Sequence, residues 1–119
     1  MTLQLMYFIL EKILEIKMPE GILSLFAGEN RSVYCFVEGL PPPTVRWLKN
    51  NKILKERKSQ QGKNLVDLAL DFPEVDLHHA GNYTCEASNY KITTKKRSIL
   101  VTVTCKHLLL TRFFHTCSL

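Results

Sequence analysis

Cysteine and histidine residues, which can hold a metal ion, occur together in the C-terminal tail of this sequence. The tail contains Cys105-x-His107 and His115-x-Cys117, and the chain has four cysteines in all. These residue types suit zinc, but structural zinc sites place roughly two to four residues between paired ligands, whereas here one residue intervenes. We therefore expect no metal site, and either a tail disulfide or two unpaired thiols.

No group of residues has the spacing of an enzyme active site. Four acidic residues occur close together, Asp67, Asp71, Glu74 and Asp76. The first two, however, fall on the outward side of a predicted strand. No serine lies in a nucleophile elbow, and no glycine-rich loop opens a helix. The adjacent pair His78-His79 is interpreted as loop surface, because neighbouring positions rarely chelate one ion. The sequence predicts neither enzymatic activity nor a cofactor.

Two asparagines lie in acceptor tripeptides for N-linked glycosylation. The tripeptides are Asn30-Arg31-Ser32 and Asn82-Tyr83-Thr84. Such tripeptides often arise by chance, but these fall in a predicted turn and at the start of a predicted strand. Glycosylation at Asn30 and Asn82 would place the chain in the secretory pathway.

Four residues in the middle of the chain have a characteristic order and spacing. Trp47 follows Cys35 by twelve residues, and Tyr83 precedes Cys85 by two. This spacing resembles that of immunoglobulin-type domains. Three further segments resemble the intermediate, or I-set, members of that family: Gly28-Glu29, Gly39–Trp47 and Leu70–Gly81. The family usually has an aspartate where this chain has His79.

The resemblance implies an all-β fold, an immunoglobulin-like Greek-key β-sandwich of two antiparallel sheets. It also implies that Cys35 and Cys85 form a disulfide between the sheets, against which Trp47 packs. The hydroxyl of Tyr83 would fasten the turn before its strand. Such a disulfide fits an oxidising compartment, and closing a loop of this length should stabilise the fold by about 4 kcal/mol.

Alternation of apolar and polar residues predicts where the strands lie. The expected strands are near Ile13–Met18, Ile22–Phe26, Ser32–Glu38, Thr44–Lys49, Lys52–Leu54, Leu65–Phe72, Gly81–Ser88 and Lys96–Thr104. Asn50-Asn51 is a predicted tight turn, and Lys55 to Lys63 a loop with at most a short strand. We expect a domain over residues 13–104, an N-terminal extension or degenerate leader over 1–12, and a tail outside the domain over 105–119. No apolar stretch is long enough to span a bilayer.

The chain is basic, with a formal charge of +5 and a pI of about 9.1. One basic group surrounds the turn after Trp47, and another lies near residues 91–97. We expect these groups at opposite ends of the sandwich, which argues against nucleic-acid binding. Heparan sulfate is an alternative ligand for the second group, through Lys95, Lys96 and Arg97. Its test is salt-sensitive heparin affinity that is lost when these three charges are neutralised.

Two leucines are expected to point outward from the same sheet. Leu48 and Leu100 would lie on the outer side of that sheet, with Arg46 and Glu86 nearby. Exposed leucines on one sheet face could anchor a protein interface, although isolated surface leucines are common.

The resemblance implies a protein-binding module from the ectodomain of a cell-adhesion molecule or receptor. Its partner would be another extracellular or cell-surface protein, a second copy of the chain included. Two alternatives remain open: an intracellular structural spacer of the muscle-filament kind, and a heparan-sulfate-binding co-receptor domain. The state of the cysteines and of the glycosylation tripeptides separates the first alternative from the extracellular interpretation.

Overall fold

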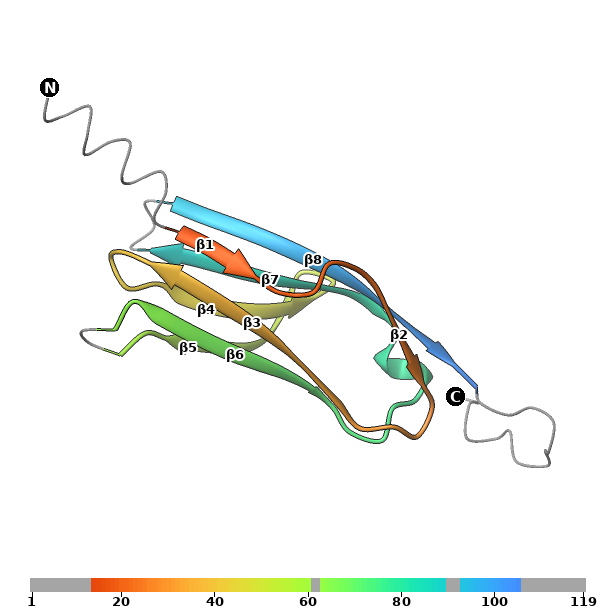
Figure 1. Ribbon diagram of the computed structural model, residues 1–119. Helices are drawn as coiled ribbons and strands as arrows, with labels where there is room; N and C mark the ends of the chain where they lie inside the picture. Colours follow the sequence, from red (N-terminus) through yellow and green to blue (C-terminus); the bar gives the residue numbers. More distant parts are fainter. Residues whose placement is uncertain (1–13, 61–62, 90–92, 106–119) are drawn as a thin grey trace, which may run out of the picture.

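Two β-sheets pack face to face in the computed structural model, which describes residues 14–60, 63–89 and 93–105 (Figure 1). The three-stranded sheet has the order β1 (Leu14–Lys17), β3 (Arg31–Gly39) and β6 (Leu65–Phe72). The five-stranded sheet has the order β2 (Gly21–Phe26), β8 (Thr93–Thr104), β7 (Gly81–Asn89), β4 (Thr44–Lys49) and β5 (Lys52–Lys58). One turn of 3-10 helix, η1 (Leu77–His79), precedes β7. The predicted all-β sandwich is confirmed.

The core between the sheets follows from the alternation of residues along each strand. On β3, Val33, Cys35 and Val37 are buried, while Tyr34 and Phe36 between them are exposed. Successive side chains of a strand point to opposite faces, so each strand contributes every second residue to the core. Burying a side chain the size of valine or leucine contributes roughly 1.5–3 kcal/mol. This alternation therefore decides which face of each sheet is turned inward.

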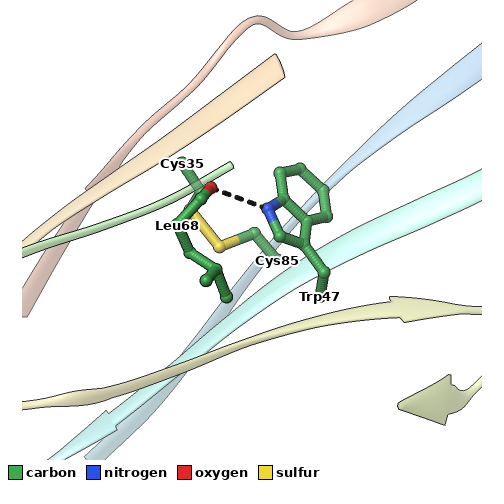
Figure 2. Close-up of a disulfide and its surroundings, with 4 residues drawn as sticks. All are labelled: Cys35, Trp47, Leu68 and Cys85. Atoms are coloured by element: carbon green, nitrogen blue, oxygen red, sulfur yellow. Dashed lines mark hydrogen bonds between the residues drawn. A yellow bond between two sulfur atoms is a disulfide. The ribbon is translucent and has the colours of Figure 1, made fainter. Parts of the chain in front are cut away.

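The disulfide between Cys35 and Cys85 joins the two sheets inside the core. Its sulfur–sulfur distance is 2.04 Å and its Cα atoms are 6.5 Å apart. The indole of Trp47 lies beside it, and Nε1 donates a hydrogen bond of 2.9 Å to the carbonyl of Leu68 (Figure 2). Because Trp47 is on β4 and Leu68 is on β6, this bond also connects the sheets, and it satisfies the polar atom of a fully buried ring.

Tyr83 closes the end of the sandwich where η1 lies. Its hydroxyl donates a hydrogen bond of 2.7 Å to the carbonyl of His79, and its ring packs edge-on against Phe72. The ring of His79 also packs edge-on against Phe72, and its Nδ1 accepts from the main-chain N–H of Asp76. The interpretation of His78-His79 as loop surface is therefore wrong for His79, which is half-buried because its ring covers Phe72.

The chain changes sheets between β1 and β2. β1 pairs with β3, whereas β2 pairs with β8, from Gly21 opposite Ile99 to Phe26 opposite Thr104. The second pairing is parallel, so the prediction of two antiparallel sheets is wrong here. The chain passes through Pro19 and Glu20 and continues as β2, which then runs in the same direction as β8.

β5 is longer than the sequence indicated. It continues to Lys58, which pairs with Thr44, so the prediction of a loop from Lys55 is wrong. Two of its side chains reach the other sheet: Lys55 Nζ donates to the carbonyl of Ala69 at 2.6 Å, and Arg57 donates to that of Asp67 at 3.0 Å. These bonds to β6 give the polar residues of β5 partners that a solvent-exposed loop would lack.

Candidate interaction face

The outward surface of the five-stranded sheet carries the residues predicted as an interface. Val45 and Trp47 are buried on β4, so Thr44, Arg46 and Leu48 point away from the core. By the same alternation the outward residues of β7 and β8 are the even-numbered ones, and those of β2 include Ile22. We call this surface the outer face.

A row of charged residues crosses the outer face over four strands. Arg46 lies opposite both Glu56 and Glu86, and Glu86 lies opposite Lys96. The Arg46 Nε is 3.8 Å from a carboxylate oxygen of Glu56 and 3.5 Å from one of Glu86, and Lys96 Nζ is 3.7 Å from the other Glu86 oxygen. We call these four residues the charged row. Two positive and two negative charges alternate along it, so it has no net charge with which to attract a partner.

Apolar side chains lie next to the charged row. Leu48 is opposite Ile53 of β5, and Leu100 is opposite Ile22 of β2. Ile22, Ile53 and Leu100 are 66%, 50% and 43% exposed, which is high for large apolar side chains. We call these four residues the apolar band. Sequence reasoning named its two leucines and missed both isoleucines. The partner of Ile22 depends on the parallel pairing of β2, whereas the predicted turn at Asn50-Asn51 already implied that Ile53 lies opposite Leu48.

Asn82 and Thr84 of β7 lie in the middle of the apolar band. Asn82 is opposite Leu100, and Thr84 is opposite Leu48 on its other side. The Thr84 hydroxyl is 2.9 Å from that of Ser98. The band is thus two apolar pairs with a polar strand between them.

Asn30 is in a different setting, in the turn between β2 and β3. Its Oδ1 accepts a hydrogen bond of 2.9 Å from the main-chain N–H of Glu74. The side chain therefore holds the segment after β6 against the start of β3, and lies outside the outer face.

Lys95, Lys96 and Arg97 do not share one surface. They alternate along β8, which begins at Thr93, so only Lys96 is on the outer face. Lys96 pairs with Glu86, and Arg97 forms a short ion pair with Glu20.

The expectation that the two basic groups occupy opposite ends of the sandwich is wrong for the end of β5. The register places Arg57 in line with Val45, Ala87 and Lys95 across the sheet. The longer β5 brings its basic residues back to the end that carries Lys95.

The opposite surface of the molecule carries an aromatic pair. Tyr34 and Phe36 stack on the outward side of β3, with ring centroids 5.8 Å apart, and Leu65 is exposed nearby on β6. The alternation that buries Val33 and Cys35 already indicated that these rings point outward. Sequence reasoning did not treat them as a site.

The described part of the chain contains no group of three or more histidine, cysteine or acidic side chains arranged to hold a metal. Nor does any helix among those residues have the length and apolarity needed to cross a membrane. The zinc and disulfide alternatives for the tail fall almost entirely outside the described residues, as does the predicted extension over 1–12.

The family model of the immunoglobulin domain matches residues 15–89. The chain belongs to the immunoglobulin domain family. Its sheet order, buried tryptophan and intersheet disulfide are those of such a domain. The I-set assignment stays a prediction.

Relatives of this immunoglobulin domain include much longer proteins. Mouse neogenin is 34% identical over 82 residues, which are 69% of this chain and 5% of neogenin. Mouse basal cell adhesion molecule is 32% identical over 85 residues, or 71% of this chain and 12% of that protein. Among solved structures, the C. elegans twitchin kinase region matches with 26% identity and a TM-score of 0.61, covering 79% of this chain and 17% of that one. The chain thus spans a small part of each of these three proteins.

Proposed function

We propose that this immunoglobulin domain is a protein-recognition module of a cell-adhesion molecule or receptor ectodomain, and that it binds through the outer face. The observation that carries the proposal is the apolar band, whose four large side chains lie on the same side of the five-stranded sheet. Exposed apolar groups of this kind are typical of protein-binding surfaces. The similarity to neogenin and basal cell adhesion molecule supports an extracellular setting.

Recognition would combine two parts of the face. The apolar band would lose water on contact and supply most of the affinity. The charged row, which is neutral as a whole, would set orientation, because a partner must match its alternating signs. No chemistry on the partner is involved.

The test is a binding screen of the secreted domain against soluble ectodomains and against itself. If a binder is found, the double variant L48D/L100D should weaken its affinity for the domain at least about 10-fold, because central interface contacts contribute about 2 kcal/mol or more each. Such a loss would assign the binding to the outer face. L65D is the control, because Leu65 is a leucine even more exposed than Leu100 but lies on the other sheet. Loss of binding in L65D alone, or the absence of any binder, would contradict the proposal.

A structural spacer in an intracellular filament protein is the second candidate, and the similarity to twitchin supports it. Intracellular cysteines are usually reduced, whereas the extracellular interpretation requires the Cys35–Cys85 disulfide and permits glycans. Intact mass after secreted mammalian expression, with and without reductant and glycosidase, separates the two. Retention in the cell with free thiols and no glycan would favour the spacer.

A further inference from the structure

Among the residues that the structure describes, Asn82 is the one glycosylation acceptor on the outer face. It is exposed, and no hydrogen bond to its side chain occurs within the described ranges, whereas Asn30 is held by Glu74. The next residue, Tyr83, is buried and its hydroxyl bonds to the His79 carbonyl, which fixes the orientation of the strand at this point. Alternation therefore directs the Asn82 amide outward, away from the core.

The neighbours of Asn82 are the members of the apolar band. Leu100 is directly opposite on β8, at the short distance between adjacent strands. Leu48 is opposite Thr84, which makes it a diagonal neighbour of Asn82 at about 7–8 Å. Ile22 lies one strand beyond Leu100. A bulky group on the Asn82 amide would stand between the two apolar pairs.

We propose that an N-linked glycan on Asn82 covers the apolar band, so that glycan occupancy decides whether the outer face can bind. The covering is inferred from the position of Asn82 between the two apolar pairs. Its consequence for recognition rests on the function proposed above.

The modification forms one bond and breaks another. The Asn82 Nδ2 bonds to the anomeric carbon of a lipid-diphosphate-linked oligosaccharide supplied by the secretory pathway. The bond from that carbon to the diphosphate oxygen breaks, the lipid diphosphate leaves with the electron pair, and Nδ2 gives up one proton. Because Tyr83 is buried in the folded domain, we place this step before β7 joins the sheet.

The charged row lies farther from Asn82 than Leu48 and Leu100 do. Glu86 is four residues beyond Asn82 on the same strand, which is about 13 Å at the rise of an extended chain. The sugars nearest Asn82 would therefore shield the leucines and isoleucines first. Such shielding also accounts for how a secreted domain can keep these apolar side chains on its surface.

The experiment compares the same secreted protein before and after glycosidase treatment, by hydroxyl-radical footprinting read by mass spectrometry. We expect oxidation of Leu48 and Leu100 to rise several-fold when the glycan is removed. Oxidation of Tyr34 and Phe36 on the opposite sheet should not change, which provides an internal control.

Two variants separate the glycan from the asparagine itself. Asn82→Gln and Thr84→Ala both abolish the tripeptide, and only the second keeps Asn82. In both variants, oxidation of Leu48 and Leu100 should be as high as in the deglycosylated wild type. In Asn30→Gln, it should stay as low as in the glycosylated wild type. An unmodified Asn82 in the secreted wild type, or equal oxidation with and without glycan, would overturn the proposal. If the footprint changes but no form of the domain binds a partner, the covering stands and the proposed recognition function fails.

Discussion

Single hydrogen bonds at the end of the core should have measurable effects on the stability of this domain, and Tyr83 offers the cleanest case. Tyr83→Phe removes only the hydroxyl that donates to the His79 carbonyl and keeps the ring against Phe72. The part-buried carbonyl then loses its partner, so we expect the free energy of unfolding to fall by about 1 kcal/mol. Urea unfolding monitored by tryptophan fluorescence measures it.

The control for this substitution is Tyr34→Phe. Tyr34 is exposed, and its hydroxyl makes no hydrogen bond within the described residues. Its change in stability should stay within about 0.5 kcal/mol. Equal effects of the two substitutions would show that the bond to His79 contributes nothing.

The residues of the core could be predicted from the sequence, and some of their partners could not. Alternation places Val33, Cys35 and Trp47 inward whatever the details of pairing. The half-buried position of His79 depends on its contact with Phe72, seven residues away across a turn. No local pattern of polarity indicates such a contact.

At the scale of elements, the hairpin between β4 and β5 depends on two residues in the left-handed region. Asn50 and Asn51 have φ angles of 51° and 68°. This pair of conformations matches the turn that joins twisted antiparallel strands, in which glycine is favoured at the second position. We expect Asn51→Gly to leave the free energy of unfolding unchanged or raise it by up to about 1 kcal/mol, and Asn51→Ala to lower it by about 1 kcal/mol.

Asn64→Gly controls for the general effect of glycine on the unfolded chain. Asn64 is exposed and lies outside the left-handed region, so the substitution should only add unfolded-state entropy and destabilise by up to about 1 kcal/mol. Thermal and urea unfolding of the three variants provide the comparison. Destabilisation by Asn51→Gly as large as that by Asn64→Gly would contradict the turn assignment.

Strand positions were largely predictable, whereas the ends and directions of some strands were not. β4 and β6 begin and end where the alternation predicts. β5 extends to Lys58 because its polar side chains bond to β6, and such long-range partners leave no periodic signal. The parallel direction of β2 likewise follows from where the chain crosses between sheets.

At the scale of the whole molecule, the three candidate heparin residues do not form one binding surface. The candidate heparin residues Lys95, Lys96 and Arg97 point to alternate sides of β8, and two of them already pair with Glu86 and Glu20. Surface ion pairs of this kind reduce the charge that an anionic polymer would meet. Any heparin affinity should therefore come from the net charge of the whole chain.

Two triple variants that each remove three positive charges test this expectation. K95A/K96A/R97A should elute from a heparin column at the same salt concentration as K17A/K52A/K63A, whose three exposed lysines lie on separate parts of the molecule. Attraction governed by net charge depends on how many cations are removed and little on which ones, and salt screens both alike. A selective loss of retention in the first variant would instead indicate a localised heparan sulfate site at the end of β8. That result would make the polysaccharide a specific ligand of this domain, and it would require Lys96 and Arg97 to leave their present carboxylate partners when the sulfates bind.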